Sequence, residues 1–152
     1  MTEVMRKGMT VRHFFEEAVR SNVPGLPYAD ENGRIAGRIS VRHVFKKVAV
    51  PSSYVRLADA MGDQTNKLDM SEKRILRALS RPVETYLLEN IPSVSPESSL
   101  IKALTIMEAY NTHYIFLIED GAYMGVVTRM VIANRLLEWL EELDGDRPAG
   151  DT

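Results

Sequence analysis

The sequence predicts an α+β fold in which a helix–strand–strand–helix unit occurs twice. The first copy of the recurring stretch runs from Leu26 to Val48 and the second from Tyr114 to Leu136. Three pairs of residues lie 88 positions apart in these stretches: Gly33 and Gly121, Gly37 and Gly125, and Ser40 and Thr128. Three matches at one offset indicate a duplication. Because neither unit alone covers both faces of its small sheet, we expect the two copies to pack together.

The composition is typical of a soluble globular protein and excludes several classes of function. The 152 residues are 45% hydrophobic and 26% charged, with a formal net charge of -2 and no cysteine. Without cysteine there is no disulfide and no thiolate metal site. The chain lacks a run of ~20 apolar residues, the apolar core of a signal peptide and a broad basic character. We therefore expect a cytoplasmic protein with no membrane span and no nucleic-acid partner.

The first copy is predicted to begin with a helix that Thr10 caps and that ends near Ser21. The residues after the cap place an apolar stripe along one helix face: Val11, Phe14, Phe15, Ala18 and Val19. A stripe of this kind normally packs against a sheet or another helix.

A hairpin and a second helix are predicted next. Two strands, residues 26–29 and 34–39, flank a turn in which Asn32-Gly33 supplies the positive φ of a tight hairpin. Residues 40–48 then return to helical spacing of apolar positions.

Residues 51–81 have no counterpart in the repeat and are predicted to form a helical connector. Apolar spacing favours one helix over residues 52–61 and another over 71–80. Beyond the connector, residues 83–88 are expected to form one or two helical turns and residues 91–94 a short strand.

The second copy is predicted to open with a helix that starts at Ser95-Pro96-Glu97. This tripeptide offers a cap, a proline at the first helical position and an acid near the positive helix end. The helix carries apolar residues 89 positions after those of the first copy: Leu100, Ala103, Leu104 and Met107. The first copy is expected to be one residue longer than the second between the helix and the hairpin, which accounts for the change of offset from 89 to 88.

The second hairpin and a final helix complete the chain. Strands are predicted over residues 114–118 and 123–127, around the turn Glu119-Asp120-Gly121. The last helix begins at Thr128 and places four residues on one face: Ile132, Leu136, Leu140 and Leu143. A polar tail from Asp144 is expected to fray.

The two recurring stretches, with the predicted lead-in helix from Ser95 to Met107, resemble a pair of cystathionine-β-synthase (CBS) domains, the tandem unit called a Bateman module. The resemblance suggests a free-standing, bacterial-type CBS domain protein. It implies tandem repeats, each a small sheet flanked by helices, packed about a pseudo-two-fold axis. The expected organisation is a first CBS motif with a shortened lead-in (1–50), the connector (51–81), a second CBS motif (82–143) and a flexible tail (144–152).

The resemblance also implies a non-catalytic regulatory module that senses an adenosine-containing ligand: AMP, ADP, ATP or S-adenosylmethionine. In similar proteins a glycine, a Ser or Thr and an Asp form the signature, with Asp binding the ribose hydroxyls. This sequence retains the glycine and hydroxyl of both copies, but His43 and Val131 occupy the Asp positions. Valine accepts no hydrogen bond, and histidine does not replace a carboxylate.

The lead-in strand distinguishes the two expected clefts. Residues 91–94 provide it in the second copy, whereas the first copy has no room for it between Val4-Met5 and Thr10. We therefore expect the second cleft to be the preferred ligand site and the first, with Gly37, Ser40 and His43, to be weaker. The residues predicted for the second cleft are Ile91, Pro92, Ser93, His113, Tyr114, Thr128 and Arg129. Arg129 lies in the first helical turn, where an anion is favoured.

Simpler explanations exist for the same residues. Ser40 and Thr128 precede helices and can be plain N-caps, and Gly37 and Gly125 can serve close backbone packing. The cluster Arg38, Arg42, Lys46 and Lys47 suits a polyphosphate, a partner's acidic surface or simply a solvated face. The histidines show no metal-ligand spacing, so no metal site is expected.

Two functions remain open at the level of sequence. The first is ligand sensing, with a regulated enzyme or transporter acting in trans. The second is a ligand-independent module that has lost nucleotide binding and forms homodimers through CBS helices, with the stripes of residues 10–21 and 98–110 as candidate interfaces. No required cofactor and no catalytic residue are predicted, since the sequence lacks a phosphate loop, a nucleophile elbow and a metal set.

Overall fold

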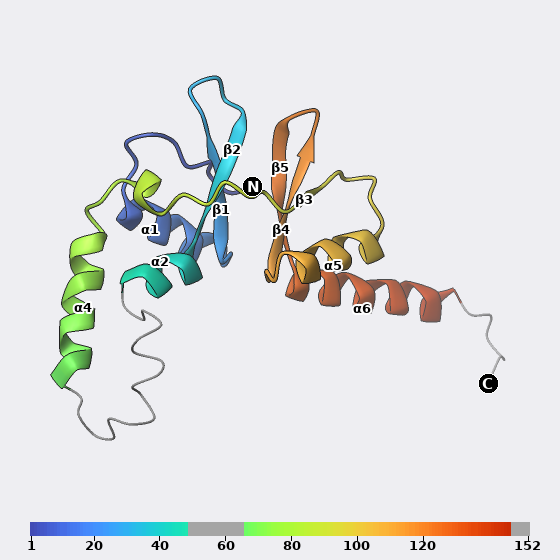
Figure 1. Ribbon diagram of the computed structural model, residues 1–152. Coiled ribbons are helices and arrows are strands. Elements are labelled where there is room, and N and C mark those ends of the chain that lie inside the picture. Colours follow the sequence, from blue (N-terminus) through green and yellow to red (C-terminus); the bar gives the residue numbers. More distant parts are fainter. Residues whose placement is uncertain (49–65, 147–152) are drawn as a thin grey trace.

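The computed structural model describes residues 1–48 and 66–146, and it places two small sheets side by side with helices at their ends (Figure 1). The predicted helix of residues 52–61 lies outside the described residues. In chain order the elements are α1 (Val11–Ser21), β1 (Gly25–Ala29), β2 (Ile35–Ser40), α2 (Val41–Val48), α4 (Asn66–Ala78), the 3-10 helix η1 (Val83–Tyr86), β3 (Ser93–Val94), α5 (Leu100–Ala109), β4 (Tyr114–Glu119), β5 (Ala122–Thr128) and α6 (Arg129–Gly145).

The helix starts follow from side-chain caps. Thr10 caps α1 as predicted, because its hydroxyl accepts a hydrogen bond from the His13 backbone N–H at 3.2 Å. The predicted start of α5 at Ser95-Pro96-Glu97 is wrong. Ser99 is the cap, accepting from the Lys102 N–H at 3.1 Å, and the preceding residues form a turn instead. The connector helix α4 also begins earlier than the predicted 71–80.

The two hairpins share their register and differ in their turns. β1 pairs antiparallel with β2, and β4 pairs antiparallel with β5, each with one register shift before the turn. In the second turn Asp120 and Gly121 both adopt positive φ, whereas in the first turn only Gly33 does. The loop of the first hairpin is one residue longer, and the Asp30 carboxylate accepts hydrogen bonds from the backbone N–H groups of Asn32 and Arg34 across it. The slippage between the two offsets therefore lies inside the turn and not before the hairpin.

The lead-in strand is present in both copies. In the second copy β3 pairs parallel with β4. In the first, Met5 forms a single parallel bridge with Tyr28, its N–H donating to Pro27 O at 2.8 Å and its carbonyl accepting from Ala29 N–H at 2.9 Å. The expectation that the first copy has no room for this strand is therefore wrong, although the strand is reduced to one residue.

Segment 87–88 covers the edge of β2 in the first sheet. Arg38 and Leu88 exchange two backbone hydrogen bonds, at 2.8 and 2.9 Å. A Cβ on Gly37 would lie 2.5 Å from the Leu88 carbonyl oxygen. Gly37 is therefore required for close approach of the chain that links the copies.

Gly37→Ala is expected to destabilise the fold by about 1–3 kcal/mol, since an added methyl forces the backbone apart. For a chain of this size the melting temperature falls by about 2–10 °C. Gly145→Ala is the matched control because a Cβ there meets nothing within 4 Å. Equal melting temperatures for the two variants would contradict the packing role of Gly37.

Each copy has its own apolar core. Most of the predicted stripe of α1 lies inside the first core, with Val11, Phe14 and Ala18 buried, whereas Val19 is exposed. Tyr86 of η1 and Ala78 of α4 join the same core. The second core is smaller and is built on residues of β3, α5, β4 and α6.

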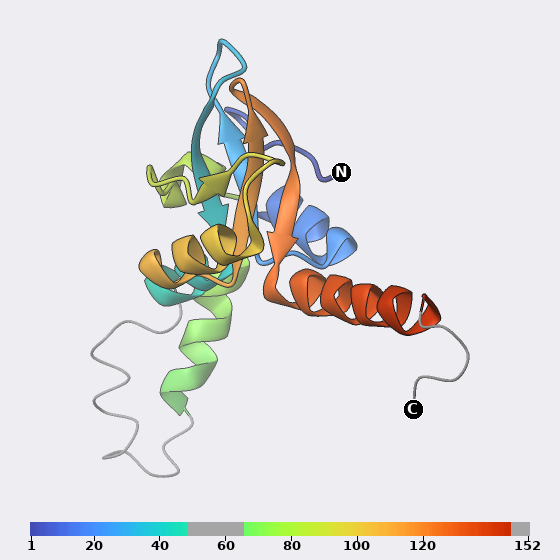
Figure 2. The ribbon, with the colours of Figure 1, turned by 90° about the vertical axis from the view of Figure 1, so that its right-hand side faces the viewer.

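Helix α6 extends away from both sheets and exposes most of its apolar residues (Figure 2). Of its predicted apolar face only Ile132 is buried. The helix instead exposes Met130, Val131, Leu136, Leu137, Trp139, Leu140 and Leu143. None of the helices in the described residues has the length and apolar character needed to cross a lipid bilayer.

Candidate functional site

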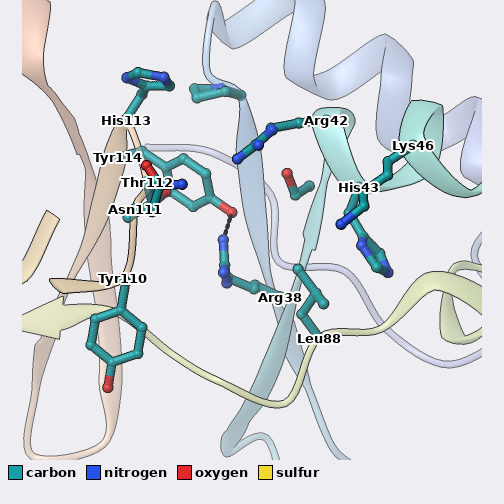
Figure 3. A pocket seen from close by; sticks show the side chains of 12 residues that line it. Arg38, Arg42, His43, Lys46, Leu88, Tyr110, Asn111, Thr112, His113 and Tyr114 are labelled. Carbon is teal, nitrogen blue, oxygen red and sulfur yellow. Dashed lines mark hydrogen bonds between the residues drawn. The ribbon is translucent and has the colours of Figure 1, made fainter. Parts of the chain in front are cut away.

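A cavity opens between the two copies of the repeat, beside the start of α2 (Figure 3). Its volume is about 290 Å³, just below the range of about 300–1,000 Å³ for ligand pockets. The first copy contributes β2 and α2, and the second contributes the loop between α5 and β4. The lining residues are Pro24, Arg38, Ser40, Arg42, His43, Lys46, Leu88, Tyr110, Asn111, Thr112, His113 and Tyr114.

The described wall of the cavity is basic. Arg38, Arg42 and Lys46 line it, and none of the lining residues that the structure describes is Asp or Glu. Arg42 and Lys46 are exposed, and neither forms a salt bridge with any residue that the structure describes. Like charges that converge on one space repel each other, so a bound anion would be favoured there.

Arg38 is almost fully buried and joins the two copies. Its Nε and Nη2 donate to the Asn90 side-chain oxygen at 3.3 and 3.2 Å, and Nε also donates to the Asn90 carbonyl at 3.1 Å. Its Nη1 donates to the Tyr114 hydroxyl (Figure 3), and the guanidinium lies 5.4 Å from the centroid of the Tyr114 ring. Neither partner is an acid, so an anion in the cavity would offset the cost of burying this charge.

Tyr114 fits between the copies because Gly25 has no side chain. A Cβ at Gly25 would lie 2.3 Å from Cζ of Tyr114. The ring of the second copy thus packs directly on the backbone of the first, and its hydroxyl is held at Arg38. Gly25 therefore fixes one wall of the cavity.

Ser40 and Thr128 occupy equivalent positions and make different hydrogen bonds. The Thr128 hydroxyl accepts from the Val131 N–H at 3.2 Å, so it is an N-cap. Within residues 1–48 and 72–146, no hydrogen bond engages the Ser40 hydroxyl, although Ser40 is buried and lines the cavity. Thr128 therefore acts as a plain N-cap, whereas ligand contact by Ser40 stays a prediction.

His43 is partly buried on the first turn of α2, beside the cavity. Burial lowers its pKa below the ordinary value of 6.5, and the charges of Lys47, Lys46 and Arg38 lower it further. The imidazole is therefore neutral near pH 7. A bound anion acts in the opposite direction and raises the pKa, so anion binding is coupled to proton uptake.

The equivalent positions of the second copy carry no such charge. At an offset of 88, the counterparts of Arg42, His43 and Lys46 are Met130, Val131 and Asn134. The second-copy cation that the sequence singled out, Arg129, donates to Glu108 Oε1 at 2.6 Å.

The structure brings together residues that the sequence assigned to two separate clefts. Ser40 and His43 from the first set and His113 and Tyr114 from the second all line one cavity. The remaining predicted residues are not in its wall: Gly37, Ile91, Pro92, Ser93, Thr128 and Arg129. Pro92 is buried, and its carbonyl accepts from Phe116 N–H at 2.9 Å, so this stretch supports the sheet.

Sequence reasoning missed the loop from Tyr110 to Thr112. A signal for it exists, because Asn22 and Asn111 are 89 residues apart and both adopt positive φ, 53° and 48°, after a helix. This recurrent turn presents the loop to the opposite copy. The described residues contain no group of three or more His, Asp or Glu side chains arranged to hold a metal ion.

Comparison with known proteins identifies the class. Residues 83–138 match the CBS domain family. The AcuB protein of Vibrio cholerae superposes on 97% of this chain and 91% of its own, with a TM-score of 0.65 and 14% identity. The CBS domain pair of protein MJ0100, solved with 5'-methylthioadenosine and S-adenosyl-L-methionine, covers 91% of this chain and 90% of its own, with a TM-score of 0.60 and 16% identity.

Two curated relatives match over different lengths. Protein MJ0450 of Methanocaldococcus jannaschii is 31% identical in an alignment that covers 49% of this chain and 44% of that protein. The A-adding tRNA nucleotidyltransferase of Aquifex aeolicus is 24% identical over 140 residues, which are 92% of this chain and 14% of that enzyme. This chain thus spans less than half the length of either relative.

Residues 83–138 are therefore assigned to the CBS domain family. The family match falls on the second copy, and the whole chain has the mixed helix-and-sheet fold of a CBS domain pair. The sequence-based assignment of the family and of the α+β fold is confirmed.

Proposed function

We propose that this protein is a non-catalytic regulatory module that binds an adenine nucleotide in the cavity between its two copies. The observation that carries the proposal is the convergence of Arg38, Arg42 and Lys46 on one cavity, with no carboxylate among its described lining residues. Phosphate groups match this charge, and arginine binds them through paired hydrogen bonds. The Ser40 hydroxyl supplies a further donor or acceptor for the ligand.

The charge of the cavity favours some of the predicted ligands over others. ATP and ADP bring several negative charges, whereas S-adenosylmethionine carries a cationic sulfonium and an ammonium group. The MJ0100 pair binds S-adenosyl-L-methionine and 5'-methylthioadenosine, which supports an adenosine-containing ligand for the fold. For this chain we propose the order ATP, ADP, AMP and then S-adenosylmethionine.

A thermal-shift titration of the whole chain tests the proposal. A ligand that binds only the folded state raises the melting temperature by mass action. ATP at millimolar concentration is expected to raise it by several degrees and S-adenosylmethionine to leave it unchanged. No shift with any of the four ligands would reject the proposal, and a larger shift with S-adenosylmethionine would reject the proposed order.

Nucleotide affinity is expected to rise as pH falls from about 8 towards about 6, around the ordinary histidine pKa. In the free protein the pKa of His43 lies below its ordinary value. A bound anion is expected to raise this pKa, so at a pH between the free and the bound pKa binding takes up a proton. Calorimetry at several pH values measures this dependence. His43→Asn provides the control, because the titration of the nucleotide itself is unchanged in that variant. Identical pH profiles for the two proteins would contradict the role of His43.

The alternative function, a ligand-independent assembly module, is favoured by one observation. Helix α6 exposes a large apolar surface for a helix on a folded protein. We therefore propose homodimer formation through α6, in place of the predicted stripe of α1. Ligand sensing and dimerisation are compatible, since the cavity and α6 use different residues.

Replacing Leu137 and Leu140 together with glutamate is expected to abolish dimer formation. Both side chains are more than half exposed, so the folded monomer remains intact while the apolar contact is lost. Sedimentation velocity over a range of concentrations measures the effect. Glu141→Gln, on the same helix, is the matched control. A monomeric wild-type protein at about 100 μM, near the weak end of specific association, would count against this interface.

A further inference from the structure

A second basic pocket lies where α2 approaches α4, apart from the cavity described above. Its volume is about 380 Å³. Six residues from α2, the end of α4 and the η1 region line it: Lys47, Val48, Arg74, Arg77, Arg81 and Tyr86. None of them lines the cavity between the copies.

Helix dipoles account for only part of this charge. Lys47 lies in the last turn of α2 and Arg77 in the last turn of α4, where the helix dipole favours a cation. Arg74 lies one turn earlier in α4, and Arg81 follows its end, so neither has this explanation. Among the residues that the structure describes, none of the four cations forms a salt bridge.

One wall of the pocket is held in place by the first core. Tyr86 is buried in the first core, and its hydroxyl accepts a hydrogen bond from Arg81 Nη1 at 3.1 Å. This contact fixes the guanidinium of Arg81 at the pocket while using only part of its donor set. Among the described residues, no Asp or Glu lines the pocket to neutralise the four charges.

We propose that this pocket binds a compact anion with two or more phosphate groups. Four cations around a space of this size match several phosphates close together. A long nucleic acid would require basic residues along an extended surface, which a chain of net charge -2 does not provide. The site is independent of the proposed nucleotide cavity, although α2 is shared: Lys46 lines the cavity and Lys47 the pocket.

Calorimetric titration of the full chain with inorganic tripolyphosphate tests the proposal. Two binding events are expected for the wild type. Replacing Arg74 and Arg77 together with glutamine removes one event or weakens it at least tenfold, and Arg42→Gln with Lys46→Gln removes the other. Lys73→Gln, which changes an exposed cation of α4 outside the pocket, is expected to alter affinity less than twofold.

Three outcomes would overturn the proposal. One is a single event that only the Arg42 and Lys46 double variant removes. Another is an equal loss in the Lys73→Gln protein, which indicates non-specific attraction. The third is binding of single-stranded RNA that depends on Arg77, without binding of tripolyphosphate. If the wild type shows a single event that only the Arg74 and Arg77 double variant removes, the nucleotide cavity is rejected and this pocket stands. Circular dichroism and melting temperature show whether each variant is folded.

Discussion

Replacing Arg42 and Lys46 together with glutamine is expected to reduce the affinity for ATP at least about a hundredfold, as measured by calorimetry at low salt. A hydrogen bond to a charged group is worth about 1.5–3 kcal/mol, and a factor of a hundred corresponds to about 2.8 kcal/mol. Both side chains are exposed, and neither is paired within the described residues, so the fold is expected to tolerate their replacement.

The control for this variant is a protein with the same change in net charge. Lys7→Gln with Lys102→Gln alters two exposed cations that do not line the cavity. Its affinity for ATP is expected to stay within about twofold of the wild type, because neither side chain lines the cavity and neither contacts a nucleotide bound there. If both double variants bind ATP equally well, the cavity is not the nucleotide site.

Arg38→Met is expected to lower stability by about 2–4 kcal/mol, the range for breaking a buried polar network. The change leaves the Asn90 side-chain oxygen and the Tyr114 hydroxyl without the donor that joins them. The melting temperature should fall by about 4–15 °C. Thermal unfolding followed by circular dichroism measures the loss.

Arg38→Lys separates charge from geometry in the same network. Lysine keeps the positive charge but lacks the planar fork that reaches two partners at once. We expect a stability between those of the wild type and Arg38→Met. A fully stable Arg38→Met protein would show that the network does not hold the two copies together.

The duplication could be predicted from sequence because backbone requirements repeat with it. Gly33 and Gly121 both adopt positive φ, and Thr10 and its counterpart Ser99, 89 residues later, both cap their helices. Such features depend on a few neighbouring residues. The start of α5 at Leu100 was missed because Ser95-Pro96-Glu97 also has the local features of a helix start, although the offset of 89 from Thr10 leads to Ser99.

The cavity could not be predicted as one site because its parts are distant in sequence. Arg38 meets Asn90 across 52 positions and Tyr114 across 76. From sequence alone an arginine is assigned to a solvated face, because burial of an isolated charge is costly. Only the packing of Tyr114 on Gly25 shows that this charge is enclosed and directed towards a cavity.

The offset of 88 has a consequence for how this protein changes through mutation. The same helix positions that are basic in the first copy, Arg42 and His43, are exposed and apolar in the second, Met130 and Val131. The two copies thus differ in chemistry on one backbone, with basic side chains in α2 and exposed apolar side chains in α6. Under the two proposals made above, substitutions in α2 change the response to an anion and those in α6 change association. The two properties are therefore free to evolve separately.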